Sequence, residues 1–170
     1  MNRHGILGIS IAAALGFALA TTPANARQKS WKEQIVGTWV MVSNVTTGPD
    51  GSKTDTYGPN PKAIAMFQKD GRMAVITARA DLPKFASGSR STGTPDENKA
   101  VVRGTIAYFG TYSVDEKDKT LTLNIDGSTF PNWTGTSQTR SVTLADGVLT
   151  QFLPIGSGGG TVVVKFQRVK

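Results

Sequence analysis

The sequence contains no cysteine, and its only histidine is His4. Disulfides are therefore excluded, so the hydrophobic core alone must stabilise the fold. A thiol nucleophile, a structural zinc site with Cys or His ligands and a lipid anchor on cysteine are excluded on the same grounds. His4 lies in a segment that we expect to be removed, which also excludes a Ser-His-Asp triad and a His-held haem. We therefore predict no metal site, no cofactor and no catalytic residue of these kinds.

Long hydrophobic runs are scarce, and the longest lies at the N-terminus. Residues 6–20 are mostly apolar but fall short of the roughly 20 residues that a membrane span needs. Arg3 precedes the run, and Ala24-Asn25-Ala26 follows it with the small-x-small pattern of a signal peptidase site. We predict a signal peptide over residues 1–26 and an exported protein, periplasmic or secreted, with no membrane span after cleavage. A short N-terminal anchor is the alternative.

The charge is moderately basic and shows no clustering. Loss of Arg3 with the signal peptide would lower the formal net charge from +7 to +6. A nucleic-acid-binding protein needs a basic stripe with interleaved aromatic residues, and no such stripe is visible. We expect no nucleic-acid partner. The basic residues are scattered through turns and tails: Lys32, Lys53, Lys69, Lys99, Lys117 and Lys170.

Turn signals divide residues 35–170 into short strands, after a lead-in over residues 27–34. Asp-Gly pairs favour the positive backbone angles of tight hairpins. Regular short strands joined by such turns are typical of an antiparallel meander, which a barrel closes without leaving an edge. We predict an all-β fold, a small antiparallel up-and-down β-barrel of eight to nine strands, with a two-sheet sandwich as the alternative. The four pairs are Asp50-Gly51, Asp70-Gly71, Asp126-Gly127 and Asp146-Gly147, and the predicted strands cover residues 36–45, 62–68, 72–79, 105–114, 120–126, 136–144, 148–153 and 161–169.

One long connection interrupts the meander. Residues 80–93 are rich in Gly, Ser and Pro, and Thr94-Pro95-Asp96-Glu97 then has the pattern of a helix start. We predict a short helix over residues 95–103. Long loops in compact domains are often functional. This one is either a lid over the open end of the barrel or a solvated insertion.

Arg140 is the sharpest local anomaly. Side chains alternate along a strand, and Val142 with Leu144 marks the inward row, which places Gln138 and Arg140 inside as well. A buried guanidinium is costly unless an anion or a hydrogen-bond network meets it. Arg140 therefore either binds a ligand, pairs with an interior carboxylate such as Asp126, or reaches solvent at a strand end.

The neighbouring strand carries tyrosines on its inward row. Tyr108 and Tyr112 share one face, and Phe109 is left on the other. An apolar interior with hydroxyls and a guanidinium suits an amphiphile with an acidic head. We predict Arg140, Gln138, Tyr108 and Tyr112 as ligand-binding residues. Trp133 either lines the cavity mouth or packs on the core.

The ends of the domain carry a family resemblance. Gly37-Thr38-Trp39 resembles the Gly-x-Trp signature of the first strand in calycin-type barrels, and Arg168 is similar to the arginine that covers that Trp. The resemblance implies that Gly37, Trp39 and Arg168 form the closed floor of the barrel, where a cation can stack on an indole. The chain as a whole resembles the bacterial and fungal lipocalin-like proteins in these segments: Ile35-Val36-Gly37-Thr38-Trp39, Tyr57-Gly58-Pro59, Asp70-Gly71-Arg72-Met73, Gly110-Thr111-Tyr112-Ser113-Val114-Asp115, Pro131-Asn132-Trp133 and Gln138-Thr139-Arg140.

The resemblance implies a barrel with an internal cavity but does not specify a ligand. The leading hypothesis is an exported protein that binds a small hydrophobic or amphiphilic molecule, with an acidic group that Arg140 would meet. The first alternative is a cofactor-free isomerase or cyclase acting on an apolar substrate with Tyr108, Tyr112, Asp126 and Arg140. The second is a barrel with a filled core whose outer surface binds a protein. The sequence does not determine the oligomeric state.

Overall fold

The structure is a computed structural model that describes residue 1 and residues 29–170. The predicted signal peptide therefore lies almost wholly outside the described residues, as does the start of the predicted lead-in. None of the helices in the described part of the chain is long and apolar enough to cross a membrane.

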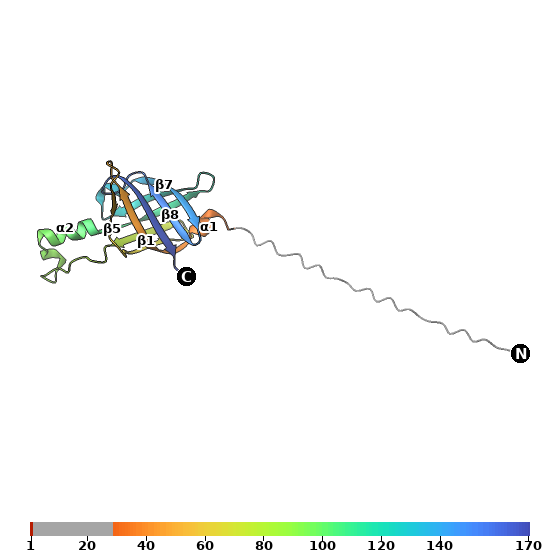
Figure 1. Cartoon of the computed structure of the whole chain (residues 1–170), viewed down its shortest axis with the longest axis horizontal. Coiled ribbons are helices and arrows are strands. Elements are labelled where there is room, and N and C mark those ends of the chain that lie inside the picture. Colours follow the sequence, from red (N-terminus) through yellow and green to blue (C-terminus); the bar gives the residue numbers. More distant parts are fainter. Residues whose placement is uncertain (2–28) are drawn as a thin grey trace.

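The fold is a closed antiparallel barrel, as predicted (Figure 1). The described residues form nine strands in the order β2-β1-β3-β4-β5-β6-β7-β8-β9, and pairing of β1 with β9 closes the ring. β2 is an additional strand outside this ring, and it pairs only with the C-terminal end of β1. The strands are β1 (Gly37–Thr47), β2 (Lys53–Asp55), β3 (Lys62–Phe67), β4 (Arg72–Ala78), β5 (Thr105–Asp115), β6 (Thr120–Ser128), β7 (Ser137–Ala145), β8 (Val148–Leu153) and β9 (Thr161–Arg168).

The turns explain why consecutive strands pair. Asp146 and Gly147 both have positive φ, 51° and 74°, and make the tight β7–β8 hairpin that an Asp-Gly pair favours. The prediction of a turn was wrong for the pair Asp126-Gly127, which lies inside β6. There Asp126 is the extra residue of a β-bulge opposite Phe109 and Gly110. A Cβ on Gly127 would lie 2.7 Å from the ring of Phe109, so glycine leaves room for that ring.

Alternation fills the interior with one row from each strand. In β5 the row of Ile106, Tyr108, Gly110 and Tyr112 is buried while Phe109 is 56% exposed, as the sequence pattern predicts. In β7, Arg140 and Val142 are likewise buried, as the alternation predicts. The largest fully buried side chains include Trp39, Phe67, Leu121, Leu123 and Leu149.

Two α-helices lie at opposite ends of the barrel (Figure 1). α1 (Trp31–Ile35) falls in the predicted lead-in and begins with a capping box between Ser30 and Glu33. α2 (Pro95–Gly104) begins with a capping box between Thr94 and Glu97, which confirms the predicted helix. Two short 3-10 helices complete the fold, η1 (Arg90–Thr92) and η2 (Pro131–Trp133).

The long connection between β4 and β5 lies outside the cavity and is mostly exposed. Val102 of α2 is 76% exposed, and Gly104 is the one buried residue of the helix. The Glu97 carboxylate accepts hydrogen bonds from the backbone N–H groups of Ala86 and Thr94, which ties the loop to the helix. The segment is an insertion beside the barrel end, and none of its residues lines the cavity described below.

Candidate functional site

One end of the barrel is closed by Trp39 and Arg168. The Trp39 side chain is fully buried, and its indole N–H donates to the Ile35 carbonyl at 2.9 Å. The Arg168 guanidinium lies 4.1 Å from the centre of the indole ring, in position for a cation–π interaction. It also donates to the carbonyl oxygens of Val36, at 2.9 Å, and of Gln34. The guanidinium thereby binds the C-terminal carbonyls of α1, which a cation stabilises.

Gly37 makes this arrangement sterically accessible. Its φ is +136°, and a Cβ built there would lie 2.7 Å from an Arg168 guanidinium nitrogen. Only glycine lets the arginine approach the backbone so closely. Gly37, Trp39 and Arg168 thus lie together where the sequence predicts a floor, away from the cavity.

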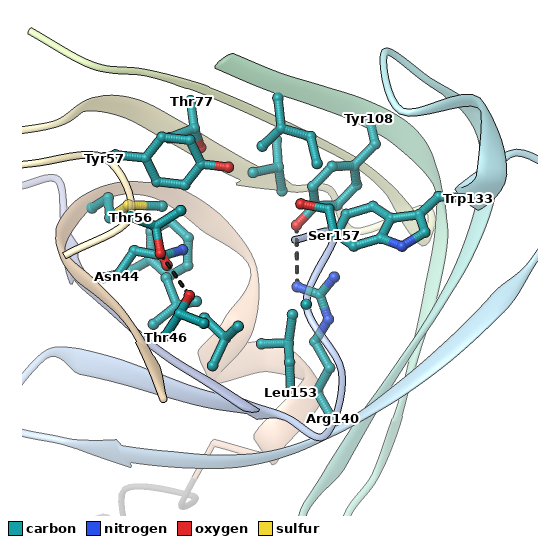
Figure 2. A pocket seen from close by; sticks show the side chains of 17 residues that line it. Asn44, Thr46, Thr56, Tyr57, Thr77, Tyr108, Trp133, Arg140, Leu153 and Ser157 are labelled. Atoms are coloured by element: carbon teal, nitrogen blue, oxygen red, sulfur yellow. Dashed lines mark hydrogen bonds between the residues drawn. The ribbon is translucent and has the colours of Figure 1, made fainter. Parts of the chain in front are cut away.

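The cavity lies farther along the barrel axis and is small. Its volume is about 50 Å³. Ser157, in the β8–β9 loop, is exposed and Trp133 of η2 is half-buried, so these two mark its solvent side (Figure 2). The polar residues of the lining are Asn44, Thr46, Thr56, Tyr57, Thr77, Tyr108, Arg140 and Ser157.

Arg140 is the one charged residue among those that line the cavity. It is 3% exposed, and its guanidinium donates to the hydroxyl of Tyr108 at 3.1 Å and to the side-chain oxygens of Gln151 at 3.0 Å and Gln138 at 2.8 Å. All three acceptors are neutral. The Nε atom is buried without a partner. Pairing with Asp126 is excluded, because that residue is exposed on the outer face of β6.

The structure brings three of the four predicted ligand-binding residues together. Tyr108 lines the cavity with its ring 5.5 Å from the Arg140 guanidinium and edge-on to Trp133 at 5.4 Å. Gln138 contacts Arg140 but does not line the cavity. Tyr112 lies elsewhere: its hydroxyl donates to the Gln68 carbonyl at 2.8 Å and its ring packs edge-on against Phe67. Tyr112 shares the face of Tyr108 but lies four residues farther along β5, in the packed part of the interior.

Trp133 lies at the cavity, and it packs there as well. It lines the cavity while its ring packs edge-on against Tyr108 and Phe130. Trp133 therefore both lines the cavity and packs on the core, the two positions that the sequence left open.

Four buried residues at the cavity or in contact with Arg140 are absent from the set of ligand-binding residues predicted from the sequence. Gln151 and Thr77 are inward on β8 and β4, and the alternation in each strand was signal enough to find them. Asn44 could not be found in this way. A bulge between Met41 and Ser43 shifts the inward row of β1, so that Asn44 instead of Ser43 is buried. Tyr57 follows β2, in a segment without periodicity.

Tyr57 is a buried phenol on the wall that Asn44 and Thr77 also line. It is 6% exposed, and burial, with a smaller contribution from Tyr108, raises the pKa of its phenol to about 12. The hydroxyl is therefore neutral over the physiological range. Nearby, the hydroxyls of Thr46 and Thr56 share a hydrogen bond of 2.6 Å.

The chemistry of the lining is hydrogen bonding beside one positive charge. No carboxylate and no imidazole belongs to it. A general base at neutral pH is therefore missing from the lining, while an anion stabiliser is present. Within the described residues there is also no group of three or more His, Asp or Glu side chains placed to hold a metal ion.

The chain is similar to several known proteins and to one family of domains. Three solved structures are similar at low identity: a lipocalin-like protein from Bacteroides uniformis ATCC 8492 (TM-score 0.42, 16% identity, 80% of this chain and 99% of that one), a protein from Bacteroides eggerthii DSM 20697 (0.41, 15%, 78% and 98%), and the REP1-NXSQ fatty acid transporter (0.36, 14%, 79% and 96%). No curated protein matches the chain in sequence. The model of the lipocalin-like domain family matches residues 36–168. That span runs from the start of β1 to the end of β9, and the chain therefore belongs to the lipocalin-like domain family.

Proposed function

We propose that this protein binds a small amphiphilic molecule in the barrel cavity, with an acidic group of the ligand held by Arg140. The observation that carries the proposal is a guanidinium that is 3% exposed and has only neutral acceptors. The apolar members of the lining, among them Ile106, Leu153 and Val164, would contact the rest of the ligand.

The energetics of Arg140 favour an anionic ligand. Burying a charged group costs several kcal/mol, which neutral hydrogen bonds offset only in part. Tyr108, Gln138 and Gln151 hold the guanidinium in place without neutralising it, and Nε has an unused donor. A carboxylate or a similar oxyanion would accept from that donor and supply the missing negative charge.

The size of the cavity bounds the ligand. Pockets for drug-sized ligands usually measure about 300–1,000 Å³, whereas this cavity measures about 50 Å³. A small acid or a head group fits that space. A longer tail would require Trp133 and the loop of Ser157, on the solvent side, to move outward.

We also propose that the protein is exported and acts as a carrier or scavenger outside the cytoplasm. The pattern of Arg3, the apolar run and Ala24-Asn25-Ala26 is that of a cleaved signal peptide. Intact-mass measurement of the protein recovered outside the cytoplasm is expected to give a chain that begins at Arg27. Recovery of the full-length chain in the membrane fraction would instead favour an N-terminal anchor.

The central test compares acids with alcohols. Butanoate, hexanoate and octanoate, and the alcohols of the same chain lengths, are titrated calorimetrically into wild type, Arg140→Leu, Arg140→Lys and the exposed control Arg103→Leu. Loss of a charged hydrogen bond worth about 1.5–3 kcal/mol predicts a roughly 10- to 150-fold weaker affinity of Arg140→Leu for acids. Arg140→Lys should recover part of it, and Arg103→Leu should match wild type. Equal affinity of wild type and Arg140→Leu for every acid would overturn the anchor role.

A barrel with a filled core is the second candidate, favoured by the small volume of about 50 Å³. It predicts that no probe binds wild type and that native mass spectrometry of the exported protein finds no co-purified small molecule. A bound molecule in the native mass spectrum would exclude it.

A further inference from the structure

The cavity has a second polar wall whose buried groups lack partners. Asn44 Oδ1 and Thr77 Oγ1 are buried, in residues 9% and 2% exposed, and neither atom has a hydrogen-bond partner. Both residues line the cavity. Buried side-chain polar atoms nearly always have a hydrogen-bond partner, because an unsatisfied one destabilises the folded protein. Two such atoms on one wall point to a group that completes them.

Different strands bring these two residues to the same wall. Asn44 is turned inward by the bulge in β1, and Thr77 lies on the inward row of β4. In Figure 2 they lie with Tyr57 on one side of the cavity, while Arg140 and Tyr108 lie on the other. The partnerless atoms are thus separated from the guanidinium by the space that a ligand would fill.

We propose that Asn44 and Thr77 bind a hydroxyl group of the ligand. A hydroxyl is both donor and acceptor, so it can donate to Asn44 Oδ1 and accept from the Thr77 hydroxyl. It is also small enough for a cavity of about 50 Å³. The neutral phenol of Tyr57 adds a donor beside it. This inference deepens the proposed function, on which it rests for the acidic group: the ligand class is a hydroxylated acid, with its two polar groups on opposite walls.

The experiment pairs ligands that differ only in the hydroxyl. Butanoate, hexanoate and octanoate are each titrated with and without a hydroxyl on the terminal carbon, and the neutral alcohols are compared with the diols of the same length. The proteins are wild type, Thr77→Val, Asn44→Leu, Arg140→Leu, and Thr143→Val on the outer face of β7 as the matched control.

Wild type and Thr143→Val are expected to prefer the hydroxylated acid of the fitting length by roughly three- to tenfold. Thr77→Val and Asn44→Leu should lose that preference and keep their affinity for the plain acid. Their melting temperatures should equal or exceed that of wild type, because each removes an unsatisfied buried polar atom. This second readout separates loss of recognition from failure to fold.

The outcomes separate the two proposals. If Arg140→Leu weakens all acids while wild type shows no hydroxyl preference, the acid site stands and the hydroxyl site is overturned. If wild type prefers diols over alcohols but binds acids no better than alcohols, the hydroxyl site stands and the role of Arg140 is overturned. A hydroxyl preference that persists in both Thr77→Val and Asn44→Leu overturns the assignment to these residues, and binding of none of the probes overturns both proposals.

Discussion

Two arginines contact the barrel interior, Arg168 half-buried at its closed end and Arg140 buried at the cavity, and their hydrogen-bond partners differ. Arg168 stacks on Trp39 and donates to backbone carbonyls at the end of α1, so its charge meets the π face of an aromatic ring and a helix terminus. Arg140 donates to three neutral side-chain oxygens, and its Nε has no partner. The first arrangement is complete without a ligand. The second is not, which is why ligand binding is assigned to Arg140.

Ionisation of the Tyr57 phenol is expected to make the stability of the protein depend on pH in the alkaline range. Its phenol has a pKa raised from 10.0 to about 12 in the folded protein. Below pH 10 the proton is bound in both folded and unfolded chains, and the contribution to stability is fully present. As pH rises through the folded pKa, the unfolded chain has lost the proton that the folded chain retained, and roughly 2–3 kcal/mol is lost.

Urea unfolding at a series of alkaline pH values is expected to show a shallower loss of stability for Tyr57→Phe than for wild type. Each protein is referenced to its own stability near neutral pH, which removes the effect of losing the hydroxyl itself. Coincident pH profiles for the two proteins would contradict the raised pKa of the Tyr57 phenol.

At the scale of elements, the two helices begin with the same capping motif but differ in their contacts with the barrel. Each has a capping box, at Ser30 for α1 and at Thr94 for α2. α1 is joined to the barrel by fully buried Ile35 and by the hydrogen bonds of Trp39 and Arg168. α2 is mostly solvent-exposed, with Gly104 its one buried residue, and it continues into β5 without lining the cavity. We therefore expect the stability of α1 to be coupled to the barrel more closely than that of α2.

Cap removal is expected to separate the two helices. Ser30→Ala should lower the global free energy of unfolding by about 1 kcal/mol. Thr94→Ala should leave it nearly unchanged and speed amide hydrogen exchange within residues 97–104, because α2 can open locally. Denaturant unfolding and hydrogen exchange measure the two effects. An equal global loss in both variants would show that α2 packs on the barrel more firmly than its exposure indicates.

On the scale of the whole molecule, the barrel divides along its axis into a packed part and a cavity. Trp39, Phe67 and Tyr112 fill the part near α1, and the cavity lies between Arg140 and the wall of Asn44 and Thr77. Several residues that line the cavity also belong to the hydrophobic core. The three side chains near α1 do not line the cavity, so we expect changes there to affect stability more than recognition.

Trp39→Ala tests that division. Removing a fully buried Trp is expected to lower the free energy of unfolding by about 3–5 kcal/mol. The affinity of the folded variant for the best-bound acid should change by less than about twofold, because Trp39 is not among the residues that line the cavity. Trp39→Phe serves as the milder variant of the same change. A loss of affinity that parallels the loss of stability would show that the floor and the cavity are coupled.

Local patterns in the sequence were enough for much of this structure. The hairpin turns, the inward rows of β5 and β7, and the helix start at Thr94 each follow from spacings of a few residues. The Gly37-Thr38-Trp39 segment with Arg168 was enough to place the floor. What failed were positions where a bulge intervenes: Asp126-Gly127 predicted a turn and lies in a strand, and Asn44 faces inward against the alternation of β1.

The sequence by itself determined the antiparallel run of short strands and the inward direction of Arg140, because turn signals and alternation are properties of short segments. Closure of the sheet into a barrel depends on the pairing of β1 with β9, which are distant in sequence. Only the tertiary structure decided which side chains meet Arg140, that Tyr112 belongs to the packed part, and that Asn44 and Thr77 share a wall. Those facts depend on strand register and on bulges, which set the depth and face of a side chain relative to strands distant in sequence.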